Sequence, residues 1–414
     1  MYKANVLVNA RTASSLGTGA RVVIDGRLGA AGSTDDVSLE LLVDDARESA
    51  RFGPEVGALA LGGAADTRVD EVDATVAALG IDELRGIAEA IVDHLRSARP
   101  DVLVDVSITR SESENVLANS NGLVHAGRYA RLSVSASAKR NRDGDLLTLS
   151  AGGTAHTIED ARVSPRLIAD ALIGKLARCD RSATLAAGDY PVVFAAEGVP
   201  GLLYPLMLGL GGENLVRGTS PLTRAVPRLA RGFSLYSDAT LFDGQGSLDR
   251  DGDGTAERRV DFVRDGEIVG GVFDAVMVAR YARRFPDRAS FAAPGCARRN
   301  GVSGTTSPGP AILAIPPGSC SDVFAGVDRG LYVEALFGVR MGNPISGEFS
   351  NSVYLGHLIE RGEIVGRVKN IMVVGNVYDA LSRVDAVGSV ATWADDDVLA
   401  PPLRLASLRV ASKR

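Results

Sequence analysis

The sequence is poor in the residues that hold metals and disulfides. Its three cysteines, Cys179, Cys296 and Cys320, are odd in number, far apart and without a C-x-x-C pair. This pattern argues against a disulfide framework and a zinc knuckle, and it favours a reducing, cytoplasmic setting. No two of the four histidines, His94, His125, His156 and His357, have the i, i+4 spacing of helical zinc sites. We expect each histidine to be a partly buried structural residue.

Long apolar segments and basic clusters are missing as well. No stretch of about 20 apolar residues is free of charges or glycine breaks, and the N-terminus lacks an apolar run of signal-peptide length. The formal charge of −6 leaves no basic field for a nucleic acid. We therefore expect a soluble, cytoplasmic protein that binds neither a membrane nor a nucleic acid.

Length and periodicity predict an α+β protein of two domains. A chain of 414 residues has room for two domains of ~100–200 residues. We expect an N-terminal α/β domain with an antiparallel meander over residues 1–185, and a β-rich domain over 186–414. The small, polar stretch at 180–189 is the expected linker.

Helical spacing, alternation and turn residues mark the expected elements of the first domain. Asp25-Gly26 is a favourable hairpin turn, and Ser164-Pro165 has the chemistry of a helix N-terminus. The elements are a hairpin at 20–34, helices at 38–52, 82–96 and from Ser164 to about Cys179, and the meander at 101–149.

The second domain is expected to begin with a strand and a central apolar helix at 199–211. From residue 228 onward, short strands joined by glycine turns predict a barrel or a strongly curved sheet, interrupted by one helix at 273–284. A polar segment follows the central helix and contains Glu213, Arg217, Thr219 and Ser220.

One acidic run, Asp249 to Glu257, resembles the first half of an EF-hand loop. Counting from Asp249, position twelve is Val260, where the loop needs a bidentate glutamate, and the flanking segments are strand-like. We therefore expect a solvated acidic turn and not a calcium site.

Six segments, in order along nearly the whole chain, resemble the TldD/PmbA (TldE) family. They are GTGARVVIDGRLGAAGSTDD, LANSNGL, GENLVRGTSPL, DGDGTAERRVDFVRDGEIVGGVFD, SGEFSNSVYLGHLIERGEIVG and VVGN. The resemblance implies a heterodimer in which the TldD subunit is a zinc metallopeptidase and the PmbA/TldE subunit lacks the metal. TldD-like chains carry His-Glu-x-x-x-His on the central helix and a cysteine ligand near the C-terminus.

On this resemblance, the three positions of the helical zinc motif fall on Leu203, Tyr204 and Leu208, and residues 388–402 contain no cysteine. None of the three side chains can serve as a zinc ligand or a general base. The resemblance thus implies a TldE-like subunit without metal, cofactor or catalytic residues of its own. Its TldD-like partner would hold zinc, and the pair would degrade or mature unfolded or modified peptides.

The same resemblance gives a role to the polar segment after the central helix. Glu213, Arg217, Thr219 and Ser220 would line the peptide channel or the partner interface. A helix-terminus cap and turn is the alternative for these four residues.

Two other functions stay open at this point. The unusual residues Tyr204, Cys296, Arg298 and Arg299, in a chain shorter than the family norm, favour a stand-alone, metal-free enzyme of a biosynthetic pathway that reuses the peptidase cleft. A structural homodimer is the other alternative.

Overall fold

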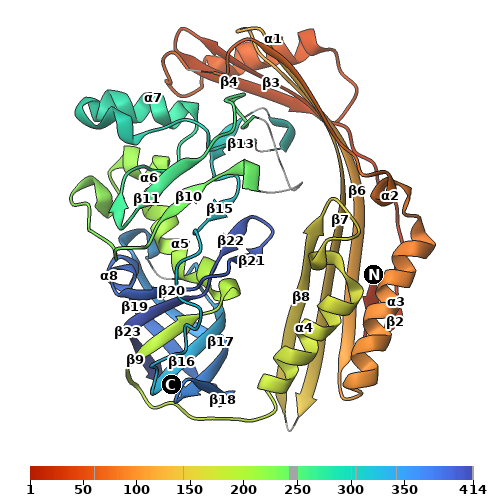
Figure 1. Ribbon diagram of the computed structural model, residues 1–414. Helices are drawn as coiled ribbons and strands as arrows, with labels where there is room; N and C mark the ends of the chain where they lie inside the picture. The colour runs from red at the N-terminus through yellow and green to blue at the C-terminus, as the bar shows by residue number, and fades with distance from the viewer. Residues whose placement is uncertain are drawn as a thin grey trace.

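The chain folds into two lobes that stand side by side (Figure 1). The computed structural model describes residues 1–59, 61–142, 144–241, 250–299, 301–303, 305–341 and 343–412. The N-terminal lobe contains the elements from β1 to α4, and the C-terminal lobe contains those from β9 to β23. Helices and strands are mixed in the first lobe and strands predominate in the second, which confirms the predicted α+β class.

The N-terminal lobe is built on a six-stranded sheet with the order β2-β1-β6-β7-β5, in which β8 also pairs with β7. Strands β6, β7 and β8 form the predicted antiparallel meander. Strand β5, which the sequence did not predict, pairs with β7 in parallel. The strands are β1 (Tyr2–Lys3), β2 (Val6–Leu7), β5 (Ala65–Glu71), β6 (Leu103–Ala118), β7 (Leu123–Arg142) and β8 (Asp145–Ala155).

A separate hairpin, β3 (Thr18–Ile24) and β4 (Arg27–Ser33), turns at Asp25-Gly26, where both residues have positive φ, 50° and 74°. This is the left-handed conformation that a two-residue hairpin turn requires. Helix α1 packs on this hairpin, and α3 and α4 pack on the sheet. The helices are α1 (Leu39–Ala50), α2 (Ala74–Ala78), α3 (Ile81–Ala98) and α4 (Pro165–Arg178).

The C-terminal lobe contains a closed five-stranded barrel with the order β16-β9-β23-β19-β17, because β17 also pairs with β16. Closure leaves no free edge in the barrel itself. Two further strands pair with its members, β18 with β17 and β20 with β23. The strands are β9 (Gly188–Phe194), β16 (Arg329–Phe337), β17 (Glu348–Glu360), β18 (Glu363–Arg367), β19 (Ile371–Asn376), β20 (Val384–Val387) and β23 (Leu403–Ser412).

A second sheet of this lobe has the order β12-β11-β10-β15-β22-β21, and β13 pairs with β14 beside it. The strands are β10 (Leu235–Ser237), β11 (Val260–Arg264), β12 (Glu267–Ile268), β13 (Ala297–Arg299), β14 (Thr306–Pro308), β15 (Leu313–Ala314), β21 (Thr392–Asp395) and β22 (Val398–Ala400). The helices of the lobe are α5 (Val199–Leu210), α6 (Gly212–Arg217), α7 (Ala275–Arg284) and α8 (Val377–Ser382). Helix α5 ends one residue before the predicted boundary, because Gly211 is extended and serves as the N-cap of α6.

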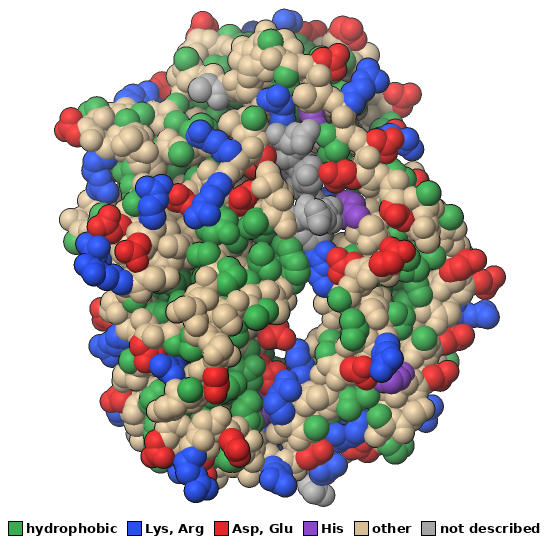
Figure 2. All heavy atoms as spheres, viewed as in Figure 1, with side chains coloured by type: hydrophobic (Ala, Val, Ile, Leu, Met, Phe, Trp, Pro, Cys, Tyr) green, Lys and Arg blue, Asp and Glu red, His purple; other side chains and the backbone are tan. Residues whose placement is uncertain are grey.

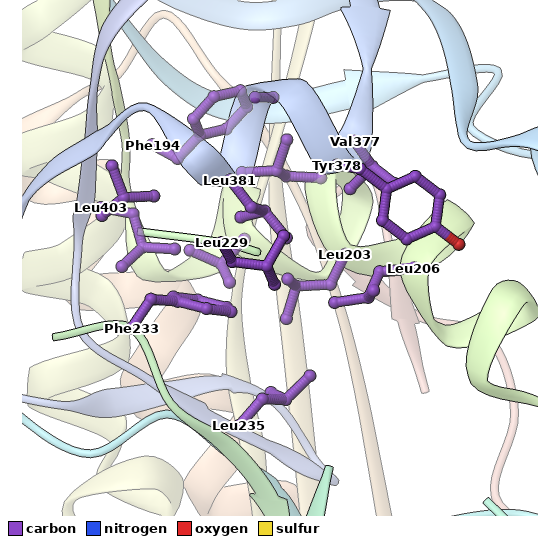
Figure 3. Packing of buried hydrophobic residues seen from close by; sticks show 14 of the residues in the cluster. Phe194, Leu203, Leu206, Leu229, Phe233, Leu235, Val377, Tyr378, Leu381 and Leu403 are labelled. Carbon is purple, nitrogen blue, oxygen red and sulfur yellow. The ribbon is translucent and has the colours of Figure 1, made fainter. Parts of the chain in front are cut away.

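Helix α5 lies inside the larger of the two main cores. Leu203 and Leu206 are at most 1% exposed and lie among Phe194, Phe233 and Tyr378 (Figure 3). Burying one such leucine contributes about 1.5–3 kcal/mol. The apolar character of the helix on most of its faces is therefore explained by packing on several sides.

Several ion pairs join the two lobes, some at the hairpin β3–β4 and others along α4 and β8. Arg21 of β3 lies 2.6 Å from Asp253 (Nη2 to Oδ1), and the side chains are 7% and 1% exposed. Arg178 of α4 donates from Nε and Nη2 to the two carboxylate oxygens of Glu334 on β16, at 3.0 and 2.9 Å. The lobes are thus connected on both sides of the space between them.

Candidate functional site: the cleft between the lobes

Helix α5 carries the three positions at which the resemblance places the zinc motif. Leu203 is 1% exposed and packs in the core with Leu206. Tyr204 and Leu208 are half-buried, and the guanidinium of Arg340 lies 5.7 Å from the ring centre of Tyr204. Hydrocarbon and a phenol at these positions stabilise packing, but none of them is a usual zinc ligand.

The polar residues after α5 do not meet in one place. Glu213 and Arg217 of α6 form an exposed ion pair with an N–O distance of 2.7 Å, and Thr219 is exposed nearby. Ser220, in contrast, is 1% exposed and donates from Oγ to the carbonyl oxygen of Gly209 at 2.6 Å. Three of the four predicted residues are accessible from outside, and the fourth is enclosed.

The acidic loop that resembles half an EF-hand is buried. Its first residue, Asp249, lies outside the described residues. Asp251 Oδ1 accepts the backbone N–H groups of Asp253 and Thr255, each at 2.9 Å, and Asp253 pairs with Arg21. Burial raises the pKa of Asp251 to about 6. The expectation of a solvated turn was wrong, because Arg21 and backbone N–H groups cover these carboxylates.

Three of the four histidines are buried: His125, His156 and His357. His94 is more exposed and lies 2.8 Å from Asp170 (Nε2 to Oδ1). Burial lowers the pKa of His156 to about 4, so this side chain is neutral at pH 7. Within the described ranges, no three His, Cys, Asp or Glu side chains are grouped so that they could hold a metal ion.

A cavity of about 690 Å³, the inter-lobe cleft, lies between β8 and α4 on one side and β16, β17 and β21 on the other. Figure 2 shows an opening between the two lobes. The volume is in the range of ~300–1,000 Å³ found for ligand sites. Its polar and aromatic lining includes Thr148, Ser150, Thr154, Lys175, Tyr354 and Trp393.

One side of the cleft is a strand edge without a partner strand. In the described chain, β8 pairs only with β7. Tyr354 Oη donates to the carbonyl of Thr148 at 2.8 Å and accepts its N–H at 3.3 Å, so the backbone groups of Thr148 point away from β7. Backbone direction alternates along a strand, so Ser150 and Thr154 face the same way. The carbonyl of Ser150 accepts from Lys175 Nζ at 3.2 Å.

A buried charge network forms part of the cleft wall. Glu334 is bonded to Arg178, and His357 Nε2 lies 2.9 Å from its Oε1. Burial alone would raise the pKa of Glu334, but hydrogen bonds from His357 and Arg178 outweigh it and lower the pKa to about 2. Glu334 is therefore ionised at pH 7 and fully engaged by its neighbours.

The residues that favoured a stand-alone enzyme do not form a site together. Burial raises the pKa of Cys296 to about 12, which makes its thiol a poor nucleophile at neutral pH. Arg298 is held by the carbonyl of Pro310, to which Nε donates at 2.9 Å. Tyr204 is on α5 and contacts Arg340 instead.

Sequence reasoning missed the inter-lobe cleft, because its walls come from segments about 240 residues apart, around Thr154 and Asp396. One signal was present in the sequence. The single tryptophan, Trp393, stands two residues before three consecutive aspartates, Asp395 to Asp397. Tryptophan is one of the residue types enriched at binding surfaces.

None of the helices in the described ranges combines the length and the apolar character needed to span a bilayer.

Known proteins resemble this chain in sequence and in fold. The family model of the PmbA/TldA metallopeptidase C-terminal domain matches residues 187–412. An uncharacterized protein of Methanocaldococcus jannaschii is 25% identical over 191 residues, which are 46% of this chain and 43% of that protein. The matched segment is thus less than half the length of this curated relative.

Solved structures agree over almost the whole chain. TldE from Thermococcus kodakarensis superposes with a TM-score of 0.80 at 19% identity, over 95% of this chain and 89% of that one. A protein of Thermotoga maritima described as a candidate modulator of a DNA gyrase gives 0.79 at 22% identity, over 95% and 88%. At these identities the likeness establishes the fold. Together with the family model, which covers more than half of the sequence, it shows that the chain belongs to the PmbA/TldD family of metallopeptidase-like proteins.

Proposed function

We propose that this chain is the metal-free, TldE-like subunit of a heterodimeric zinc peptidase, and that it acts in the cytoplasm with a TldD-like partner. The partner holds the zinc and cleaves unfolded or modified peptides. The observation that carries the proposal is the chemistry of α5, where Leu203, Tyr204 and Leu208 stand at the motif positions. Leu203 is enclosed in the core and a leucine side chain cannot donate to zinc, which supports the proposal.

The inter-lobe cleft supports a role in holding peptide. Within the described chain no strand pairs with the outer edge of β8, where Tyr354 and Lys175 contact the backbone of Thr148 and Ser150. An extended peptide can pair with such an edge as an added strand. Main-chain pairing gives affinity with little dependence on sequence. This suits a subunit that presents many different unfolded peptides to a partner.

In this proposal, α6 and the residues after it form the surface that contacts the TldD-like subunit. Glu213 and Arg217 are exposed and paired with each other, and Thr219 follows them at the surface. An exposed ion pair contributes little to the fold, so these side chains are available for contacts with another subunit.

The first test is co-expression of this chain with a TldD-like protein that carries His-Glu-x-x-x-His. We expect the two chains to co-purify, the complex to contain zinc and cleave casein, and this chain alone to do neither. If this chain alone bound one equivalent of zinc and cleaved peptide, the proposal would be wrong. If it bound no TldD-like partner and turned over a small molecule, the stand-alone enzyme would replace it.

A second test examines the strand edge in the cleft. Ser150→Pro removes the outward N–H and places the proline ring where an added strand would pair, while an edge strand tolerates proline at such a position. We expect the complex with Ser150→Pro to bind a labelled unfolded peptide about tenfold more weakly. Ser150→Ala is the matched control, since it keeps the N–H and should bind as the unmodified complex does. Equal binding by all three complexes would exclude this edge as the peptide site.

A further inference from the structure

A concave surface between α6 and α7 of the C-terminal lobe and Glu55 of the N-terminal lobe is lined mainly by arginine. This surface, the arginine notch, has a volume of about 530 Å³ and is lined by Glu55, Val216, Arg280, Arg283 and Arg284. The three arginines are spaced i, i+3 and i+4 on α7 and therefore share one face of the helix. In Figure 2, blue and red side chains are interspersed over this part of the molecule.

Neighbouring groups hold two of the notch arginines, Arg280 and Arg284, without neutralising their charge. Arg280 donates from Nε and Nη2 to the backbone carbonyl of Glu55, at 3.2 and 3.0 Å. The guanidinium of Arg284 lies beside Gly218, which ends α6, and 5.5 Å from the ring centre of Phe285. A carbonyl, a glycine and a ring position the side chains but carry no opposing charge.

No carboxylate within the described chain forms an ion pair with Arg280, Arg283 or Arg284. The acidic side chain of the lining, Glu55, lies 3.3 Å from Arg27 (Oε1 to Nη2). The adjacent Arg217 is matched by Glu213, at 2.7 Å. The notch thus concentrates positive charge on a protein whose formal net charge is −6.

Helix electrostatics explains only part of this arrangement. Cations in the last turn of a helix are favourable because they face the negative end of its dipole, and this applies to Arg283 and Arg284. It does not explain why Arg280, one turn earlier, is held over the same concave surface by the Glu55 carbonyl.

We infer that the arginine notch is a docking site for a short acidic segment of a partner protein. Guanidinium groups bind carboxylates through paired N–H donors, and three of them in one concavity match two or three consecutive Asp or Glu residues. A nucleic acid fits less well, because Glu213 and Asp287 are exposed on the neighbouring elements and would meet its phosphates. This inference is independent of the peptidase proposal.

The test measures fluorescence anisotropy of fluorescein-labelled hexaglutamate with the full chain. We expect saturable binding that weakens as salt increases, because the contacts are charge pairs at an accessible surface. Arg283→Glu should weaken binding by about tenfold or more, and Arg280→Glu should act in the same direction. Arg283 is exposed, so its replacement leaves the fold intact.

Arg68→Glu is the matched control, since Arg68 is exposed on β5 and its reversal changes the net charge by the same amount. It should alter the affinity by less than about twofold. The inference is overturned if hexaglutamate does not bind, or if Arg283→Glu and Arg68→Glu have the same effect. Tighter binding of a single-stranded oligonucleotide that is lost in Arg283→Glu would assign the notch to nucleic acid instead.

Discussion

At the scale of single residues, Glu334 is the charge on which one contact between the lobes depends. Its side chain is 2% exposed, yet it is ionised, because Arg178 from the other lobe donates to both of its oxygens and His357 Nε2 from the neighbouring strand lies 2.9 Å from Oε1. A buried charge is costly when its partner is removed, since the desolvation cost remains without the compensating attraction. Glu334 of β16 therefore connects the C-terminal wall of the inter-lobe cleft to α4, which belongs to the opposite wall.

The lowered pKa of Glu334 predicts a specific loss of stability in acid. A folded pKa of about 2, below the ordinary 4.5, adds stability that is complete above pH 4.5 and is lost as pH falls toward 2. We expect the free-energy advantage of the wild type over Glu334→Gln to shrink by about 3 kcal/mol between pH 6 and pH 2. Urea denaturation across this pH range measures the difference.

The matched control is Glu348→Gln, because Glu348 is an exposed residue of the same barrel. The free energy of unfolding of Glu348→Gln should change with pH almost as that of the wild type does between pH 6 and pH 2. Parallel curves for Glu334→Gln and the wild type would show that Glu334 is not the titrating group.

At the scale of elements, the residues between the helices fix where each helix ends and the next begins, from α5 to the short 3-10 helix η3 (Pro221–Thr223). Gly218 ends α6 with φ 78°, a conformation that glycine adopts without strain. Ser220 then caps η3, since its Oγ accepts the N–H of Leu222 at 3.2 Å and also donates to Gly209 of α5. One buried hydroxyl thus ties the end of α5 to the start of η3.

Ser220→Ala should lower the free energy of unfolding by about 1–2 kcal/mol, because it removes a helix cap and leaves the Gly209 carbonyl unpaired. Urea denaturation at pH 7 measures the change. Thr219→Ala, at the exposed neighbouring position, should change it by less than about 0.5 kcal/mol. A Ser220→Ala protein as stable as Thr219→Ala would contradict the capping role.

At the scale of the whole molecule, the hairpin β3–β4 closes the structure over the acidic loop of the C-terminal lobe. Arg21 donates to Thr306 Oγ1 at 2.8 Å as well as pairing with Asp253. The backbone N–H of Gly62 donates to the carbonyl of Asp253 at 3.2 Å, so a second segment of the first lobe meets the same loop. The N-terminal lobe is thereby held at its far end, away from the α4 contact.

Removal of the Arg21 side chain should loosen the hairpin β3–β4 from the acidic loop around Asp253. We expect Arg21→Ala to cost about 3–5 kcal/mol, because it leaves Asp253 buried without its cation, and to speed hydrogen exchange of the β3 and β4 amides. Arg27→Ala, which removes an exposed pair on the same hairpin, should cost less than about 1 kcal/mol. Unchanged exchange in Arg21→Ala would show that other contacts hold the hairpin.

The sequence by itself determined the local elements and the family. Asp25-Gly26 predicted its hairpin turn, Ser164-Pro165 predicted the start of α4, and glycine-punctuated strands predicted the barrel. These features depend on neighbours in the chain, through φ preferences, caps and periodicity, so they can be read locally. The family follows from the order of motifs, and the lack of His, Cys, Asp and Glu in α5 is a matter of residue identity alone.

Only the tertiary structure decided which of these elements meet. Periodicity shows that a face is buried but not what covers it, so the parallel pairing of β5 with β7 was not predictable. Asp253 is buried because Arg21, more than 200 residues earlier, lies against it. The inter-lobe cleft and the arginine notch arise in the same way, from segments that are distant in the sequence and adjacent in the folded structure.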